Sequence, residues 1–393
     1  MGEVLDDMYN GQTPSRNKSE YWNGNIKWLS SGELNRGTVY DSIEMITEDG
    51  QKSANLRIVP KGTFIMAITG LEAAGTRGNC ALLGFDTTLN QSCMALFPKK
   101  DLLTSDFLFQ WYRKVGEEYG LNYTQGTKQQ SYNAELIKIL PISLPLVTEQ
   151  KKIASYLSNL DHLITLHQRK LEKLQLVKKS MLEKMFPKNG SKIPEIRFEG
   201  FADDWEQRKL NDVAKFSKGN GYSKGDLIEA GTPIILYGRL YTKYETTISD
   251  VDTFVVAKDG SVYSKGGEVI VPASGETAED IARAATVDKP GILLGGDLNV
   301  VMPNEEINSA FLAISISNGS SQRELAKKAQ GKSVVHIHNE EIRNLVVPFP
   351  TKAEQNKIVD YFANLDSLIT LHQRKLEKMK SFKKSLLEKL FVQ

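Results

Sequence analysis

Two long stretches of the chain carry a seven-residue apolar repeat that predicts continuous amphipathic helices. Residues 149–186 and 354–393 contain no Pro or Gly and are rich in Leu, Lys and Glu, which favour helix. Apolar residues and one histidine recur at every seventh position in both stretches, which predicts a coiled-coil seam. The predicted packing residues are Ile153, Leu160, His167 and Leu174 in the first stretch and Ile358, Leu365, His372 and Met379 in the second. The two helices should pack together, with antiparallel pairing and an approximate two-fold axis favoured over parallel pairing.

The regions before these helices have the pattern of mixed α+β domains. Short runs rich in β-branched residues end at Gly or Pro, as strands do. Such runs are found at residues 63–70, 268–275, 292–303 and 344–350. Residues 106–119 and 309–317 each predict one helix within these regions. The fold class predicted is therefore α+β, with two globular domains that are each followed by a long helix.

A tandem duplication relates the two halves of the chain. At an offset of 205 residues, residues 149–186 align with residues 354–391, and 26 of the 38 positions are identical. The same offset pairs weaker anchors upstream, such as Gly62 with Gly267, so the repeat includes the globular part. Nearly identical helices indicate a shared structural or docking task, and diverged domains indicate two different ligands; recent recombination between the helix copies is the alternative. The predicted parts are domain 1 at 1–147, spacer helix 1 at 148–187, linker and domain 2 at 188–350, and spacer helix 2 at 351–393.

Composition excludes several classes of protein. The chain has 393 residues, of which 40% are hydrophobic and 25% charged, as in folded globular proteins. No apolar run reaches the ~18 residues of a membrane span, and the first residues do not resemble a signal peptide, so a cytoplasmic location is expected. Two cysteines are too few for a disulfide scaffold. The net charge is +2. Because the two helical stretches are basic, the rest of the chain is acidic, and DNA binding by the domains would need local basic patches or a partner's charge.

Motifs for bond chemistry, cofactors or metals are not found in the sequence. Gly331-Lys332-Ser333 resembles the end of a phosphate-binding P-loop, but Ala326 stands where that loop requires glycine. His336 and His338 alternate on a predicted strand, and no Cys or third His is near them in sequence. A surface or DNA-facing role is therefore favoured over metal binding. We expect no catalysis, no cofactor and no metal site in this chain.

The whole arrangement resembles the specificity subunit of type I restriction-modification systems. The resemblance is carried by two diverged domains, by the near-identical helices that begin E-Q-x-K-I, and by residues 194–210, PEIRFEGFADDWEQRKL, which precede the second domain and are called the lead-in segment below. It implies two target-recognition domains that each read half of a split, asymmetric DNA site. It also implies helices that act as a ruler and as a dock for two methyltransferase (modification) subunits, which restriction subunits join. The first domain departs from this pattern, because Met1–Val4 aligns near residues 211–213 and no lead-in segment stands before it in this sequence. Either the start is truncated or the strand is supplied otherwise.

Polar loops of both domains supply side chains suited to DNA. Arg, Lys, Asn and Gln can read base edges, and phosphate contacts set the register. The loops considered are residues 15–28, 126–133, 237–247 and 331–339. The candidate DNA-binding residues are Arg16, Lys18, Tyr21, Lys27, Lys128, Gln129, Gln130, Arg239, Tyr241, Lys243, Lys332 and His336. A coiled-coil scaffold or adaptor that binds protein and not DNA is the alternative function, which the acidic balance of the domains favours and their duplication with divergence opposes.

Overall fold

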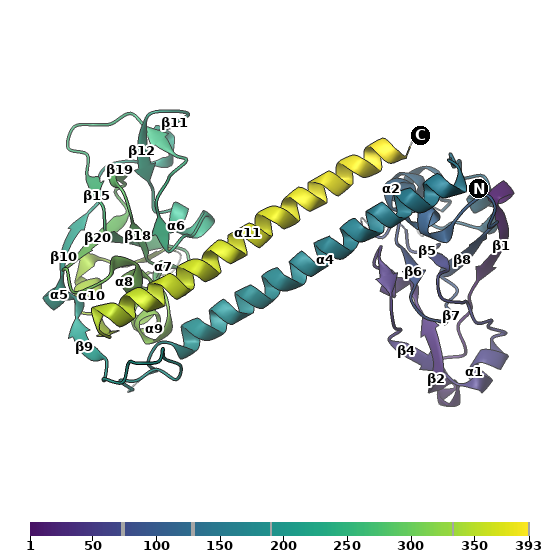
Figure 1. The fold of residues 1–393 in the computed structure, drawn as a ribbon, viewed down its shortest axis with the longest axis horizontal. Helices are drawn as coiled ribbons and strands as arrows, with labels where there is room; N and C mark the ends of the chain where they lie inside the picture. Colours follow the sequence, from purple (N-terminus) through teal and green to yellow (C-terminus); the bar gives the residue numbers. More distant parts are fainter. Residues whose placement is uncertain (72–74, 127–129, 189–190, 332–333, 392–393) are drawn as a thin grey trace. The chain divides into compact units, whose positions relative to one another are not determined.

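The computed structural model describes residues 1–71, 75–126, 130–188, 191–331 and 334–391 (Figure 1). The chain forms two compact units. Unit 1 contains Met1–Arg169 and Gln373–Gln393, and unit 2 contains Lys170–His372. The division falls inside both long helices, so each unit holds one globular domain and one half of each helix. Each unit is both helical and stranded, as the α+β prediction requires.

The globular part of unit 1 is built on two small sheets. The five-stranded sheet has the order β1-β8-β5-β6-β3, with strands β1 (Leu5–Asn10), β8 (Cys93–Pro98), β5 (Phe64–Ala67), β6 (Cys80–Leu83) and β3 (Thr38–Val39). Its neighbours are antiparallel except β3 and β6, which are parallel. The second sheet has the order β4-β2-β7, with strands β4 (Glu44–Ile46), β2 (Trp22–Leu29) and β7 (Thr88–Leu89). All four residues of β5 and of β6 are buried, as expected of strands covered on both faces.

Unit 2 repeats the five-stranded sheet of unit 1. Its order is β10-β20-β16-β18-β13, with strands β10 (Ala214–Lys218), β20 (Leu298–Pro303), β16 (Glu268–Pro272), β18 (Ala285–Val287) and β13 (Thr247–Ile248). The parallel pair is again the last one, β13 with β18. A second sheet, β11-β14-β12-β19-β15, consists of β11 (Leu227–Ile228), β14 (Phe254–Val255), β12 (Thr232–Ile235), β19 (Pro290–Leu294) and β15 (Tyr263–Lys265). The two-stranded sheets are β17 (Ser274–Gly275) with β21 (Val335–His336), and β22 (Val346–Phe349) with β9 (Glu206–Lys209).

Helices complete both units. Unit 1 has α1 (Glu48–Ser53), α2 (Ser105–Asn122) and α3 (Ala134–Lys138), and unit 2 has α5 (Leu210–Val213), α6 (Arg239–Thr242), α7 (Ala278–Ile281), α8 (Ser309–Ile316), α9 (Gly319–Lys328) and α10 (Asn339–Arg343). The short 3-10 helices are η1 (Gly2–Val4), η2 (Ser19–Tyr21), η3 (Ser31–Glu33) and η4 (Lys224–Asp226). The long helices are α4 (Val147–Lys184) and α11 (Lys352–Leu390), close to the stretches that the heptad pattern predicted. The side chain of Thr104 caps α2, and that of Asn308 caps α8.

The repeated glutamine near the start of each long helix locks that helix to its own domain. Gln150 is fully buried, and its amide nitrogen donates hydrogen bonds to the carbonyl oxygens of Leu102 (2.7 Å) and Pro145 (3.0 Å). Its amide oxygen accepts from the backbone of Thr104 (3.0 Å), the capping residue of α2. Gln355 makes the equivalent bonds in unit 2, to the backbone of Asn308, Glu306 and Pro350. Because a buried amide must be satisfied, this position explains the shared Gln of the two E-Q-x-K-I motifs.

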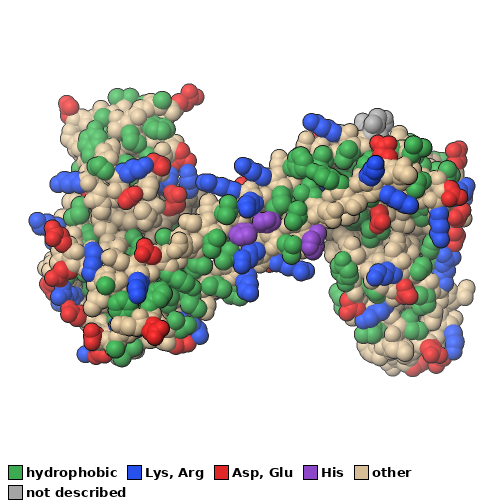
Figure 2. Space-filling view, viewed as in Figure 1, with side chains coloured by type: hydrophobic (Ala, Val, Ile, Leu, Met, Phe, Trp, Pro, Cys, Tyr) green, Lys and Arg blue, Asp and Glu red, His purple; other side chains and the backbone are tan. Residues whose placement is uncertain are grey.

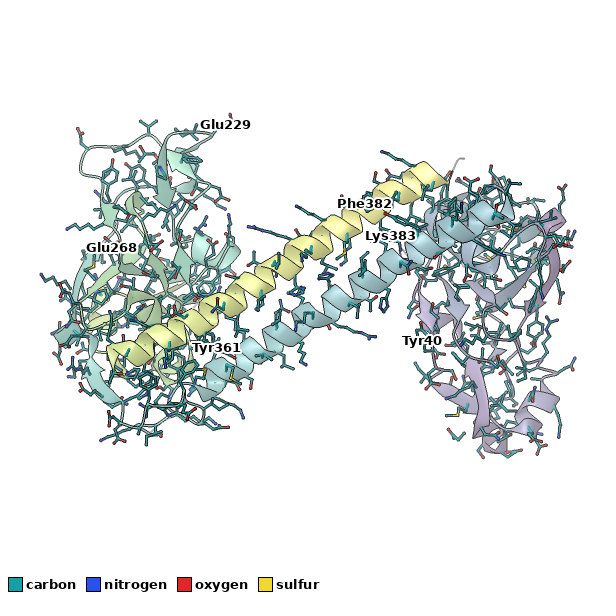
Figure 3. The ribbon with its side chains drawn as sticks, viewed as in Figure 1. Tyr40, Glu229, Glu268, Tyr361, Phe382 and Lys383 are labelled. Atoms are coloured by element: carbon teal, nitrogen blue, oxygen red, sulfur yellow. The ribbon has the colours of Figure 1, made fainter. Side chains whose placement is uncertain are left out.

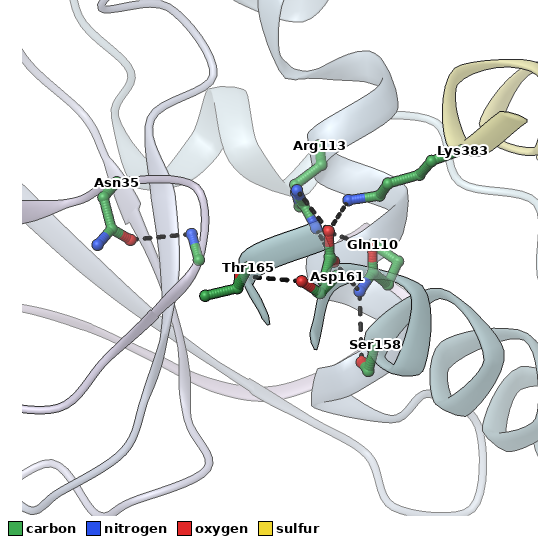
Figure 4. Close-up of polar contacts among 8 residues, drawn as sticks. Asn35, Gln110, Arg113, Ser158, Asp161, Thr165 and Lys383 are labelled. Carbon is green, nitrogen blue, oxygen red and sulfur yellow. Dashed lines mark hydrogen bonds and ion pairs between the residues drawn. The ribbon is translucent and has the colours of Figure 1, made fainter. Parts of the chain in front are cut away.

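Within unit 1, the first half of α4 pairs with the last half of α11. Leu157 of α4 and Phe391, the residue after α11, belong to one apolar core. Further along α4, Asp161 forms an ion pair with Lys383, which lies earlier on α11, so the two segments run antiparallel. Arg113 of α2 also pairs with Asp161 at 2.5 Å, as Figure 4 shows. This contact ties both long helices to the globular domain.

Unit 2 contains the repeat-related ion pair. Lys178 of α4 pairs with Asp366 of α11 at 2.5 Å. Asp161 and Asp366 are 205 positions apart, and so are Lys178 and Lys383. The same two repeat positions therefore form an ion pair in each unit. Leu160, Leu174, Ile358 and Leu365 of the predicted seam are buried, and Ile153, His167, His372 and Met379 are half-buried.

Candidate nucleic-acid interface

A glycine turn after the first strand begins the candidate site in each domain. Gly11 follows β1, and a Cβ atom there would overlap the carbonyl group of Leu89. Gly219 follows β10, and a Cβ atom there would overlap the carbonyl group of Gly295. Only glycine permits this approach of the two backbones. The same turn therefore starts a loop at the same place in both repeats.

The residue after this glycine carries an amide side chain in both domains. The backbone nitrogen of Gln12 donates to Leu89 (3.0 Å), and that of Asn220 donates to the repeat-related Leu294 (2.9 Å). The side chain of Gln12 is exposed. The side-chain nitrogen of Asn220 donates to the carbonyl oxygen of Gly260 (2.8 Å). Amide side chains can donate and accept hydrogen bonds at once, which suits them to base edges.

In unit 1 this loop borders an open hollow of ≈ 750 Å³. Lys18 is the charged residue among its lining residues, and the others are polar or aromatic except Pro14 and Ala54. Asn55, which also lines it, has a left-handed backbone (φ 48°) and is exposed. The lining residues are Tyr9, Asn10, Gln12, Thr13, Pro14, Ser15, Lys18, Tyr21, Ser53, Ala54 and Asn55. The hollow thus combines amides, hydroxyls, two tyrosine rings and one cation.

Arg16 holds the wall of this hollow in place. Its guanidinium lies 3.7 Å from the ring centroid of Trp22 and forms two hydrogen bonds with Glu44, at 2.5 and 2.9 Å. The hydrogen bonds and charge of this pair raise the pKa of Arg16 and lower that of Glu44. Lys18 donates to the hydroxyl of Tyr21 (3.0 Å), and this hydrogen bond raises the pKa of the lysine. Arg16 therefore positions the loop, and Lys18 and Tyr21 face the hollow.

The other candidate residues of unit 1 lie in different settings. Lys27 of β2 pairs with Asp41 at 2.5 Å, which neutralises its charge locally. The side-chain oxygen of Gln130 accepts from Arg77 (3.1 Å). Lys128, Gln129 and, in unit 2, Lys332 lie outside the described residues.

In unit 2, Tyr241 and His336 both contact Ser274. The hydroxyl of Tyr241 donates to the carbonyl oxygen of Ser274 (2.8 Å), and the hydroxyl of Ser274 lies 3.2 Å from Nδ1 of His336. Burial raises the pKa of Tyr241, so its hydroxyl stays a donor. The rings of His336 and His338 stack, with centroids 6.4 Å apart and planes at 6°. A polar surface with two stacked imidazoles results.

Arg239 corrects the expectation that it faces DNA. Its side chain is only 7% exposed and pairs with Glu245 (2.7 Å) and Asp252 (2.8 Å). A guanidinium enclosed by two carboxylates stabilises its own loop and has no free charge for phosphate. Lys243 also pairs with Asp252 (2.8 Å), and this hydrogen bond lowers the pKa of the aspartate. Residue spacing does not reveal these pairs, because they depend on how the chain folds between Arg239 and its partners Glu245 and Asp252.

Three amide side chains, Gln12, Asn55 and Asn220, were missed by the sequence reasoning. Each of Gln12 and Asn220 follows a glycine at the end of a strand, and this pair of a glycine and an amide was the available signal for both. Asn55 had no such signal. Lys and Arg side chains are interspersed with Asp and Glu over both globular parts (Figure 2), so neither presents a wide basic face in this view.

Metal-binding groups and membrane-spanning helices are not found among the described residues. Within these ranges, no His, Cys, Asp and Glu residues form a group of three or more that could hold a metal ion. No helix in the described part of the chain is both long and apolar enough to cross a bilayer.

Comparison with known proteins gives concordant matches. The family profile "Type I restriction modification DNA specificity domain" matches residues 1–176 and 202–381. The MjaVIII and MjaIX type I restriction enzyme specificity subunits of Methanocaldococcus jannaschii are each 24% identical to the chain; the alignments cover 97% and 98% of this chain and 89% and 90% of those proteins. The crystal structure of a type I restriction-modification S subunit from M. genitalium has a TM-score of 0.62 at 15% identity, over 100% of this chain and 95% of that one. The fold is therefore shared with that S subunit.

Proposed function

Because the chain belongs to the type I restriction-modification DNA specificity family, we propose that it is the DNA-reading subunit of such a system. The relatives are specificity subunits, a role without catalysis of its own. In this proposal the chain binds double-stranded DNA at a bipartite, asymmetric site. It directs two methyltransferase subunits, and the restriction subunits that join them, to that site.

The observation that carries the proposal is the repeated glycine turn with different side chains after it. Gly11 and Gly219 begin equivalent loops, and the next residues are Gln12 and Asn220. The scaffold is the same, whereas the hydrogen-bonding groups differ in length and surroundings. Two domains that share one loop geometry but carry different side chains suit a DNA site whose two halves differ in sequence. Phosphate contacts from Lys18 and its neighbours would set the register of unit 1 on the duplex.

The long helices suit a ruler and a dock. Their heptad seam and the two repeat-related ion pairs specify one register, Asp161 with Lys383 and Lys178 with Asp366. A slip of one heptad would separate these partners by ~10 Å. Fixed register matters for a protein that reads two half-sites, because DNA repeats every ~34 Å. The nearly identical outer faces of the two helices would each bind one methyltransferase subunit.

Methylome sequencing tests this assignment. The chain is expressed with its cognate methyltransferase subunit, once as wild type and once with residues 194–350 replaced by those of a relative. We expect a bipartite methylated motif in which only one half changes on replacement. A short helical insertion between Lys173 and Lys178 should change the spacer and leave both half-sites intact. A replacement that changes both halves would contradict the division of labour.

A protein scaffold that never contacts DNA is the second candidate function. The paired charges at Arg16, Lys27 and Arg239 are the observation that favours it, because carboxylates neutralise these three cations of the described loop residues. The assembled complex distinguishes the two functions. Gln12→Ala together with Asn220→Ala should leave assembly intact and remove sequence preference if the chain reads DNA, whereas unchanged preference would favour the scaffold.

A further inference from the structure

A pocket in unit 2 lies at the position where unit 1 has an arginine. Nine residues after the capping residue of the domain helix, unit 1 has Arg113 and unit 2 has Ser317. The guanidinium of Arg113 extends to Asp161 of α4, where it forms an ion pair. In unit 2 the helix breaks after this position, since Gly319 has a left-handed backbone (φ 67°) and begins α9. The short side chain of Ser317 therefore lines a pocket of ≈ 260 Å³, called the small pocket below.

The walls of the small pocket suit a flat ring with polar edges. Leu182 of α4 and Phe362 of α11 supply apolar surface, and the amide side chains of Asn318 and Gln322 line the same space. Asn318 donates to the carbonyl oxygen of Ile314 (2.8 Å), which leaves its side-chain oxygen as an acceptor. Amides can match the donors and acceptors on the edge of a nucleobase. Because sites for drug-sized ligands span ~300–1,000 Å³, the small pocket has room for about one ring system.

Two cations that line the small pocket keep donors for a ligand. Lys178 pairs with Asp366 at 2.5 Å, and an ammonium group has three N–H donors. Arg283 donates to the carbonyl oxygen of Leu240 (3.1 Å) and lies 3.5 Å from Asp280. A guanidinium has five donors, so these contacts do not exhaust it. The small pocket can therefore accept an anionic or strongly polar group as well as a ring.

A second hollow of ≈ 610 Å³, called the basic hollow below, adjoins the small pocket. Lys179 and Arg323 line it, are exposed, and form no ion pair with any residue that the structure describes. Lys188 also lines it and pairs with Glu195 (3.0 Å), and Glu183 is the one carboxylate among the described lining residues. The basic hollow therefore suits a group with more than one negative charge. The residues that line both spaces are Leu182, Asn318 and Gln322.

We propose that the small pocket and the basic hollow together bind a nucleoside phosphate. The base lies against Phe362 with its polar edge toward Gln322, and the phosphates accept charge-assisted hydrogen bonds from Lys179 and Arg323. The bound ligand contacts α4, α9 and α11 at once, beside Tyr361, which Figure 3 labels. It would hold the domain of unit 2 on its two helix segments. The site is separate from the reading loops, so the inference goes beyond the proposed function and holds whether or not those loops read DNA.

Titration calorimetry on the full chain tests the proposal with ADP and UDP, one purine and one pyrimidine nucleotide. Inorganic diphosphate and the free nucleosides are the partial ligands. We expect one site per chain for at least one nucleotide, and binding about tenfold or more weaker for its partial ligands, because each lacks one set of hydrogen bonds. Diphosphate that binds as tightly as both nucleotides would overturn the proposal. Absence of binding by both nucleotides at about 5 mM would overturn it as well.

Substitutions separate the phosphate site from the base site. Lys179→Glu and Arg323→Glu should each weaken the nucleotide and diphosphate alike, by about tenfold or more. Gln322→Leu should weaken the nucleotide and leave diphosphate unchanged. Lys384→Glu, at the repeat equivalent of Lys179 in unit 1, is the matched control and should change neither. A control as damaging as Lys179→Glu would indicate general charge attraction and overturn the proposal.

Hydrogen exchange locates the ligand in the same samples. Bound nucleotide should protect α9 and residues 178–188 and leave α2 of unit 1 unchanged. Protection of α2 without protection of α9 would overturn the proposal. A single-stranded hexanucleotide distinguishes two sources of the same chemistry. Tighter binding than the mononucleotide, with the same protected residues, would assign the site to a strand of nucleic acid, and weaker binding would assign it to a free nucleotide.

Discussion

Lys383 is expected to destabilise unit 1 at neutral pH, although it forms an ion pair. Its side chain is 8% exposed, and burial, assisted by the nearby charge of Arg113, lowers its pKa from 10.5 to about 8. Asp161 opposes this shift at the lysine, but it also accepts from Arg113 at 2.5 Å, so its charge is shared. For Asp161 itself, burial raises the pKa, and the hydrogen bonds and charges of both cations outweigh that effect and lower it. Replacing Lys383 therefore leaves Asp161 with a partner.

The magnitude follows from the linkage between protonation and folding. A folded pKa about 2.5 units below the unfolded value costs about 3 kcal/mol wherever both states bind the proton, which is below pH 8. The cost shrinks as pH rises through 8, because the folded state releases the proton first, and it vanishes above about pH 10.5. At pH 9.5 less than half of this cost remains. Lys383→Met keeps the apolar stem and removes the charge, so we expect up to about 3 kcal/mol of added stability at pH 7 and less than half of that at pH 9.5.

Urea unfolding at both pH values checks this prediction. Hydrogen exchange of α2, which lies in unit 1, reports the opening of that unit alone. Lys178→Met is the matched control, because Lys178 is the repeat equivalent, is 23% exposed, and pairs with Asp366 without an arginine in the described part of unit 2. We expect this control to lose up to about 1 kcal/mol. The reasoning would be refuted if Lys383→Met lowered the stability of unit 1 at pH 7, or if its effect were the same at both pH values.

Three further outcomes are expected. Gln12→Ala in the assembled complex should weaken specific binding by about 1–3 kcal/mol relative to non-specific DNA and relax one methylated half-site; an unaltered motif would remove Gln12 from the reader. Lys18→Gln should weaken binding to all sequences alike and reduce the slope of log K against log salt by about 1, as titrations at several salt concentrations would show. Burial raises the pKa of Cys80 to about 12 and also raises the pKa of Cys93. Both thiols should therefore resist iodoacetamide at pH 8 in the folded protein and react fully in denaturant. Rapid labelling of the folded protein would contradict their burial in the core.

The repeat contacts explain why the two helix copies stay so alike. The glutamines Gln150 and Gln355 each satisfy three backbone groups at the junction of helix and domain. The two ion pairs between α4 and α11 use one pair of repeat positions twice. Each helix copy contributes one residue to the ion pair of unit 1 and one to that of unit 2, because each unit combines the first part of one helix with the last part of the other. These contacts constrain the helices, whereas the loops after Gly11 and Gly219 are free to diverge.

Local pattern was sufficient for the duplication, the long helices and the α+β class. A heptad repeat specifies an apolar stripe on a helix whatever the rest of the fold is. The offset of 205 residues between the repeats can be read from the sequence alone. The pairing of those helices was also accessible, because two amphipathic stripes in one chain can cover each other, whereas the antiparallel direction was only favoured over the parallel one. Within the candidate site, Lys18 and Tyr21 lie at the hollow of unit 1 as polar loop residues can.

Only the tertiary structure decided which charges are free. Arg239 looked like a phosphate contact, but Glu245 and Asp252 enclose it, and such pairs depend on where the chain folds back rather than on spacing. The same holds for Glu149 and Glu354, two copies of one residue in nearly identical helices. One is exposed and the other is buried under Arg197, because burial is a property of what packs above a residue. Sequence determines the chemistry that each position offers, and long-range packing determines whether that chemistry is satisfied inside the protein or left available to a partner.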